Sequence, residues 1–473
     1  METRSRHRLI DNQPTSDDRW AAEELAAIEL HDARLNRRCQ ELAVAFGHPA
    51  DAPINQACED WADTKAAYRF FDNANVAPEK ILKPHSQRTV ERLRAYPLVL
   101  AVQDSSYLDY THHPHTQGLG EIGSKKLQLR GFGLHTTLAV TPQGLPLGVL
   151  AQSFFTRPLG KPPRKTPHLR KQPIEAKESY RWLAAFRHTQ ALAPAGVEVV
   201  TVCDREADFY EMFAEAQENQ AGLLVRAKVN RRLAEAGIGK LWDKLEGQDV
   251  AGYLQVEVAK TEKQAPRTAQ VAVRCAPVRL EPPWRPAGQK LPVVALHAIL
   301  VSEVDAPADV AEPIEWLLLV NRRVDHFDQA LEVVGWYGCR WQSEVFHKIL
   351  KSGCRVEDCR LQTADRLRNF IALKSVIAWR IHWLTYLNRV AGDGPCTRAL
   401  TAAEWQALYL RIHKSKPLPD QPPTLRQAVR WIAQLGGFLG RKADGEPGVT
   451  VVWRGWQRLQ DMADTWYLLQ EHS

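Results

Sequence analysis

Residues 337–351 read YGCRWQSEVFHKILK and place four polar side chains at helical spacing. Each residue of a helix turns by about 100°, so Tyr337, Arg340, Glu344 and Lys351 fall within about 60° of one another. The apolar side chains of the segment fall outside this stripe. A helix face that combines a phenol, a carboxylate and two cations has two interpretations. It is either an ion-paired surface, or a metal-binding acid flanked by groups that bind an anion.

The composition is that of an ordinary globular protein. The chain has 473 residues, 44% hydrophobic and 25% charged, which is enough for two to four domains with sizeable cores. The net charge of +7 is a mild cationic excess that a polyanionic partner would complement. The N-terminus lacks the apolar segment of a signal peptide, and no apolar run approaches the roughly 18 residues of a membrane span. We therefore expect a cytoplasmic protein that does not enter a membrane, with its eight Cys as free thiols.

The first part of the chain is helical in pattern. Residues 17–46 predict one amphipathic helix, and residues 56–95 predict several shorter helices. Basic residues gather in this region: Lys65, Arg69, Lys83, Arg88, Arg92 and Arg94. The region is either a solvated helix surface or a domain that reads DNA.

Strand patterns begin at Pro97 and predict the order strand–strand–strand–helix–strand–helix–strand. The first strand ends on Asp104, and the fourth, a β-branched run, ends on Asp204. Residues 230–310 hold further strand-like pieces between Pro-rich turns, which predicts a β-rich insertion. A basic, Pro-rich loop at 156–173 is either a linker or a phosphate contact. Helical patterning returns at 326 and, after a Pro-rich loop, continues to the C-terminus.

Three carboxylates stand out in this order: Asp104, Asp204 and Glu344. If the first and fourth strands are neighbours in a mixed sheet, both Asp side chains lie at one end of it, and a helix across that end could add Glu344. Clustered carboxylates repel one another unless a cation lies between them. Mg²⁺ prefers hard oxygen ligands, and two such ions can activate and stabilise the oxygens of a phosphodiester. Arg340 and Lys351, with Tyr337, would then bind nucleic-acid phosphates.

Several segments carry a family resemblance. They are AVQDSSYLDY (101–110), VCDREAD (202–208), WLLL (316–319) and YGCRWQSEVFHKILKSG (337–353), the last with the spacing Y-x2-R-x3-E-x6-K. Through them the chain resembles the DDE transposases of the bacterial insertion-sequence-four family, and among these the transposase of transposon five. The likeness extends from about Trp20 to the end of the chain.

The resemblance implies an α/β fold built on a ribonuclease-H-like catalytic core. That core would span residues 97–389, with the β-rich insertion at about 230–310. Residues 1–96 would form a helical domain that recognises transposon ends, and residues 390–473 a helical dimerisation domain. The implied partners are double-stranded DNA, at transposon ends and at the target, and a second copy of the chain in a synaptic homodimer. The implied setting is the bacterial cytoplasm, at the nucleoid when DNA is bound.

The resemblance also implies two sets of site residues. The catalytic and metal-binding set is Asp104, Asp204 and Glu344, with two Mg²⁺ ions that Mn²⁺ can replace. The DNA-binding set is Tyr337, Arg340, Lys351, Trp316 and Arg226. Trp316 matches an aromatic residue that stacks on a flipped base, and its alternative is a core strand residue. Arg226 matches a basic residue near the active site, and its alternative is a structural ion-pair partner.

The implied function is cut-and-paste DNA transposition. Water attacks the phosphodiester at the end of the element, and the 3′-OH that results attacks target DNA. Excision through a hairpin intermediate is the route of the relative. Two alternatives remain: a metal-dependent nuclease of the same fold that does not join DNA, and an inactive DNA-binding regulator of transposition.

Overall fold

A computed structural model gives the fold of the chain. It describes residues 19–47, 50–58, 60–123, 125–157, 172–235, 239–258, 266–285, 290–308, 310, 312–414, 417–441 and 444–471. Most of the basic loop predicted at 156–173 lies outside these residues. Within them, no helix is long and apolar enough to cross a membrane.

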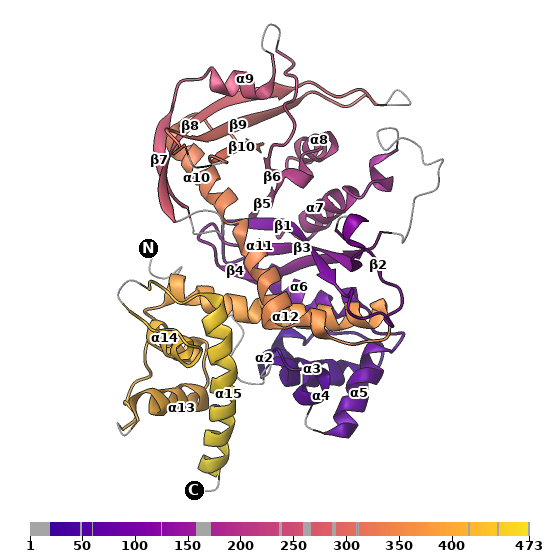
Figure 1. Cartoon of the computed structure of the whole chain (residues 1–473), viewed down its shortest axis with the longest axis vertical. Coiled ribbons are helices and arrows are strands. Elements are labelled where there is room, and N and C mark those ends of the chain that lie inside the picture. The colour runs from indigo at the N-terminus through magenta and orange to yellow at the C-terminus, as the bar shows by residue number, and fades with distance from the viewer. Residues whose placement is uncertain are drawn as a thin grey trace.

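A ten-stranded mixed sheet forms the centre of the molecule (Figure 1). Its strand order is β2-β3-β1-β5-β6-β10-β9-β8-β7, and β4 pairs with β3. The strands are β1 Leu98–Asp109, β2 Gly120–Glu121, β3 Arg130–Val140, β4 Pro146–Phe155, β5 Glu198–Cys203, β6 Gly222–Arg226, β7 Gly252–Val258, β8 Arg267–Leu280, β9 Val294–Glu303 and β10 Glu315–Val320. The pairs β1–β5 and β5–β6 are parallel, and the other pairs are antiparallel. This mixed α/β sheet between helical termini confirms the predicted fold class.

The sheet follows the sequence pattern closely. The parallel strand β5 is almost fully buried, as its β-branched run requires. Strands β3 and β4 form a hairpin, whose turn places Gly144 at φ +87°, a conformation that glycine adopts without steric cost. The β-rich segment predicted at 230–310 supplies β7, β8 and β9. It extends the core sheet through β10, so one continuous sheet spans the core and the insertion.

The N-terminal helices pack below the sheet in Figure 1. They are α2 Arg19–Glu24, α3 Ala33–Gly47, α4 Ile54–Ala57, α5 Trp61–Phe71 and α6 Pro78–Leu93. The prediction of one helix over 17–46 is wrong, because the chain breaks between α2 and α3. His31 adopts a left-handed φ of 60°, and the Asp32 carboxylate accepts a hydrogen bond from the Arg34 N–H at 2.8 Å. This local turn competes with the continuous helix that composition favours.

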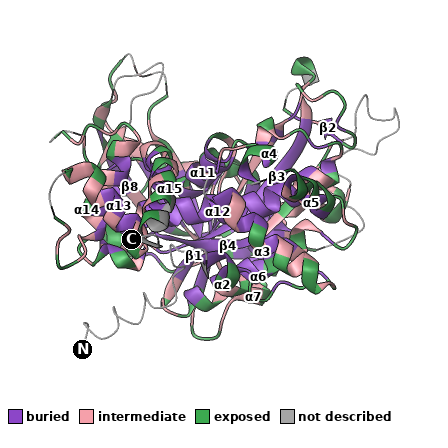
Figure 2. Cartoon of the chain, turned by 90° about the horizontal axis from the view of Figure 1, so that it is seen from below, coloured by how far each residue is buried: buried purple, intermediate pink, exposed green. Residues whose placement is uncertain are grey.

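The remaining helices flank the sheet or form the C-terminal part. They are α7 Tyr180–Leu192, α8 Tyr210–Glu218, α9 Leu241–Glu246, α10 Phe327–Gly338, α11 Trp341–Lys348, α12 Ala364–Ala391, α13 Ala402–His413, α14 Leu425–Leu435 and α15 Val449–Glu471. Helix α12 is buried along most of its length (Figure 2). It packs against β4 and against helices of both terminal parts (Figure 1), while α6 also packs directly on β4, where the Ser86 hydroxyl donates to the Leu150 carbonyl at 2.9 Å.

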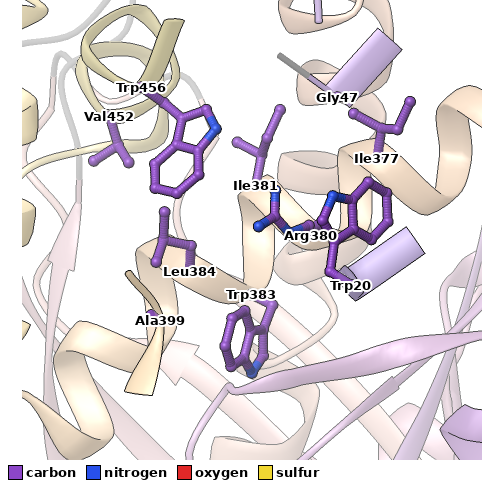
Figure 3. Close-up of a pocket in the computed structure, with 10 residues that line it drawn as sticks. All are labelled: Trp20, Gly47, Ile377, Arg380, Ile381, Trp383, Leu384, Ala399, Val452 and Trp456. Atoms are coloured by element: carbon purple, nitrogen blue, oxygen red, sulfur yellow. The ribbon is translucent and has the colours of Figure 1, made fainter. Parts of the chain in front are cut away.

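A cluster of aromatic residues joins α2 and α15 to α12 (Figure 3). The Arg380 guanidinium of α12 lies 4.7 Å from the ring centroid of Trp20 on α2, and 5.4 Å from that of Trp456 on α15. Both indoles are buried. A cation between desolvated aromatic faces is stabilising, so this cluster fixes α2 and α15 on the central helix.

Candidate active site

Asp104 lies on β1, and Asp204 directly follows the end of the neighbouring parallel strand β5. Strands β1 and β5 pair from Leu98 opposite Glu198 to Val102 opposite Val202. Extending this register by two residues sets Asp104 beside Asp204. The condition set in the sequence analysis, that the first and fourth strands are neighbours, is therefore met. The expected end of the first strand at Asp104 is wrong, because β1 continues to Asp109 by pairing with β3 after its β5 partner has ended.

The Asp104 carboxylate is held from two sides. Its Oδ1 accepts a hydrogen bond from the Ser105 N–H at 2.9 Å, and its Oδ2 accepts one from the Ser343 hydroxyl at 3.0 Å. Arg340 Nη1 lies 3.5 Å from the same Oδ2. Burial raises the pKa of Asp104 to about 6, and the charge of Asp204 adds to the rise against the opposing effects of these donors. The carboxylate thus faces a neighbouring negative charge in a poorly solvated position.

Glu344 reaches the same place from a helix. Its carboxylate pairs with Arg340, whose guanidinium also pairs with Asp104. One guanidinium therefore bridges two of the three predicted acids. Among the residues that the structure describes, no group of three His, Cys, Asp or Glu side chains is arranged to hold a metal ion. Arg340 supplies the positive charge between Asp104 and Glu344 in this conformation.

The segment 337–351 departs from the single regular helix that its periodicity predicts. Helix α10 ends at Gly338, α11 begins at Trp341, and a π-helical turn at Ile349–Gly353 carries Lys351. Inserted π turns are common at functional sites. The four signature residues therefore come from three successive segments rather than from one straight stripe.

Asp204 caps the turn that follows β5. Its Oδ1 accepts a hydrogen bond from the Glu206 N–H at 2.8 Å, at the start of a short 3-10 turn, Arg205–Ala207. The Glu206 carboxylate in turn accepts a hydrogen bond from Arg181 Nη2 at 2.8 Å. The backbone of the conspicuous CDREAD segment thus orients the second aspartate.

The predicted DNA-binding aromatics form a pair. The rings of Trp316 and Tyr337 lie 5.7 Å apart, with Trp316 half-buried and Tyr337 only 6% exposed. Trp316 packs against the hydrophobic core, in line with the alternative that it is a core strand residue. Its side chain is only partly buried. In this conformation Tyr337 is packed inside, so a DNA contact by its ring needs the pair to open.

The predicted basic residues have protein partners here. Lys351 donates a hydrogen bond to the Tyr107 carbonyl at 3.0 Å and lies 3.2 Å from the Glu357 carboxylate. Arg226 Nη2 donates to the Glu315 carbonyl at 2.8 Å, which ties it to the strand that bears Trp316.

Two of the basic residues of the N-terminal helices, Arg92 and Lys65, lie in contrasting positions. Arg92 is buried and donates to Glu24 at 2.9 and 3.0 Å, so it is structural. On α5, Lys65 lies 5.1 Å over the ring of Trp61, which is 67% exposed. An exposed aromatic and cation on one helix face suit a nucleic-acid surface.

Sequence reasoning missed the residues that support the two aspartates. Ser343 and Arg181 lie 239 and 76 residues from the partners they contact on β1, Asp104 and Ser105. Sequence periodicity carries no signal for such contacts. Ser343 directly precedes Glu344, and that adjacency was the one available hint.

Two comparisons with known families agree with this architecture. A family model described as "Transposase DNA-binding" matches residues 17–76, which include α2 to α5. A second, described as "Transposase Tn5 dimerisation domain", matches residues 376–467, from the second half of α12 into α15. The protein thus combines a DNA-binding region with a dimerisation region, which implies an enzyme that cleaves and transfers DNA strands. Both matches support a Tn5-like transposase of the insertion-sequence-four family.

Proposed function

We propose that the protein cuts DNA at the ends of a transposon and joins those ends to target DNA, with Asp104, Asp204 and Glu344 as catalytic residues. The supporting observation is the meeting of three distant segments at one place in the sheet. The parallel pairing of β1 and β5 supports a shared location for the two aspartates, and Arg340 pairs with both Asp104 and Glu344.

The donor set suits divalent cations. Three carboxylates supply hard oxygen ligands, and Asp104 resists ionisation because of burial and the charge of Asp204. We propose that Asp104, Asp204 and Glu344 hold two Mg²⁺ ions, which Mn²⁺ can replace. When bound, such ions polarise the phosphodiester and lower the pKa of attacking water. The cation now between Asp104 and Glu344 is the Arg340 guanidinium, so we expect Arg340 to leave the carboxylates as the site is loaded.

The neighbouring residues act by holding DNA. A released Arg340 offers a two-point fork to a phosphate, and Lys351 offers a point charge from the π turn. Trp316 provides an indole face on which an unstacked base can rest, beside Tyr337. We propose that this stacking holds the strand end for excision through a hairpin. Arg226, fixed to the strand that carries Trp316, adds a further phosphate contact.

A cleavage and joining assay tests the proposal. The purified protein is incubated with a labelled duplex that carries the terminal repeat of the element, a target plasmid and Mg²⁺. We expect cleaved ends and joined products. Asp204→Asn should abolish both while it preserves end binding, and Asp249→Asn, which removes an exposed carboxylate outside the site, should retain both. Cleavage without joining would assign a nuclease, and binding without cleavage in Mg²⁺ or Mn²⁺ would assign a regulator.

A further inference from the structure

We propose that Arg181 is a positioning residue that holds Asp104 and Asp204 in mutual register. The inference rests on the proposed function, because it concerns how the two proposed catalytic aspartates are oriented. Arg181 is on α7, and it touches neither aspartate directly.

The guanidinium of Arg181 binds the residue next to each aspartate. Its Nε donates to the Ser105 hydroxyl at 3.2 Å, and its Nη2 donates to the Glu206 carboxylate at 2.8 Å. Ser105 directly follows Asp104 on β1, and Glu206 lies two residues after Asp204. One side chain therefore links β1, which carries Asp104, to the turn after β5, which begins at Asp204.

The same two neighbours orient the aspartates through their backbone. The Ser105 N–H donates to Asp104 Oδ1 at 2.9 Å, and the Glu206 N–H donates to Asp204 Oδ1 at 2.8 Å. The two chains of contacts, here called relays, are built alike. Arg181 binds the side chain of Ser105 or Glu206, and the backbone N–H of Ser105 or Glu206 donates to the oxygen of the nearby aspartate. A displacement of Arg181 would therefore loosen both carboxylates together.

Arg181 is itself firmly held. Its Nη1 donates to the Glu178 carbonyl at 2.8 Å and to the Glu178 carboxylate at 3.1 Å. The guanidinium lies 4.4 Å from the Phe155 ring centroid, and the side chain is only 11% exposed. The contacts of Arg181 use Nε, Nη1 and Nη2 of its planar guanidinium. A lysine ammonium cannot reproduce this planar arrangement of donors. Lysine at this position keeps the charge and loses the simultaneous hold on Ser105 and Glu206.

Arg181→Lys tests the inference against a matched control on the same helix. Arg187 makes a two-point pair with Glu215 at 2.5 and 2.6 Å, and its partner contacts neither aspartate. Arg187→Lys therefore removes a similar fork without touching the relays. Three quantities are compared: amide hydrogen exchange of peptides that contain Ser105 and Glu206, Mn²⁺ affinity of the complex with a terminal-repeat duplex by titration calorimetry, and the cleavage rate.

We expect Arg181→Lys to weaken Mn²⁺ binding and to slow cleavage by about 10- to 100-fold each, the usual effect of losing a support for a metal ligand. Exchange at Ser105 and Glu206 should be faster without metal or DNA, while the end affinity and the thermal midpoint stay near those of the wild type. Arg187→Lys should match the wild type in all three measurements. Unchanged exchange and unchanged Mn²⁺ affinity in Arg181→Lys would overturn the inference.

Two further variants keep the test decisive if Arg181→Lys does not fold. Glu206→Gln weakens the hold on the Asp204 side alone, and Ser105→Ala weakens the hold on the Asp104 side alone. Each should accelerate exchange in its own segment and weaken Mn²⁺ binding, and if neither does so the inference fails. The proposed function is judged separately by Asp204→Asn. An active Asp204→Asn overturns that function, whereas an inactive one beside a fully active Arg181→Lys overturns only the role of Arg181.

Discussion

Asp104→Asn should stabilise the fold at neutral pH, although it should destroy activity. Burial and the charge of Asp204 raise the pKa of Asp104 from its ordinary 3.8 to about 6 in the folded chain. An acid with a raised pKa keeps its proton longer in the folded state than in the unfolded state. The free energy of unfolding therefore falls as pH rises between these two values. Asparagine resembles the neutral acid and does not titrate, so the variant avoids this loss.

The magnitude follows from the two pKa values. The full difference corresponds to about 3 kcal/mol of unfolding free energy, and most of it develops between pH 4 and pH 7.5, about 2 to 3 kcal/mol. The substitution also changes the contacts with Ser343 and Arg340, which adds a constant amount to the free energy of unfolding. This amount cancels when the difference between Asp104→Asn and the wild type is compared at two pH values. For a chain of this length the change corresponds to about 2 to 4 °C in thermal midpoint.

The assay is thermal unfolding in EDTA, followed by circular dichroism at pH 4 and at pH 7.5. EDTA removes divalent cations that would otherwise neutralise the carboxylates. The advantage of Asp104→Asn over the wild type should be larger at pH 7.5 than at pH 4 by the stated amount. A difference between Asp104→Asn and the wild type that does not vary with pH would refute the reasoning about this site.

Three other perturbations test separate parts of the account. Glu24→Gln leaves the buried Arg92 without its charged partner and should cost about 3 to 5 kcal/mol in urea unfolding, and a loss below 1 kcal/mol would refute a structural role for this pair. Trp316→Ala should remove stacking worth about 1 to 3 kcal/mol and abolish the fluorescence rise of a 2-aminopurine placed at the flipped base, whereas Trp316→Phe should keep most of it. An undiminished signal in Trp316→Ala would mean that the base stacks elsewhere. Lys351→Gln should reduce the salt slope of end binding by about 1, as expected for one lost phosphate contact, and an unchanged slope would exclude that contact.

The sequence predicts the parts of the site that depend on strand order. Two apolar runs that end near aspartates predict two strands, and these strands, β1 and β5, pair in parallel with an aspartate beyond the same end of their paired residues. The succession of strands and helices along the chain and the β-rich character of 230–310 follow from alternation and turn composition. These features arise from local patterns, and local patterns are what a sequence displays most directly.

Features set by long-range contacts or by competing local geometry are harder to predict. The stripe through Tyr337 and Lys351 assumes a constant 100° turn, and the chain breaks that helix near Cys339 and inserts a π turn. The sequence predicts a DNA phosphate as the partner of Arg340. In the free chain its anionic partners are Asp104 and Glu344. The role of Arg181 depends on contacts with two other elements, β1 and the turn after β5, and spacing along the chain cannot reveal it.

The central claim is that Asp104, Asp204 and Glu344 bind divalent ions next to DNA. The most direct measurement is a crystal structure of the protein bound to its terminal-repeat duplex in Mn²⁺, with the ions located by anomalous scattering. Anomalous peaks ligated by Asp104, Asp204 and Glu344, with Arg340 moved onto a phosphate, would match the account. Peaks elsewhere, with Arg340 still pairing Asp104 to Glu344 in the DNA complex, would contradict it.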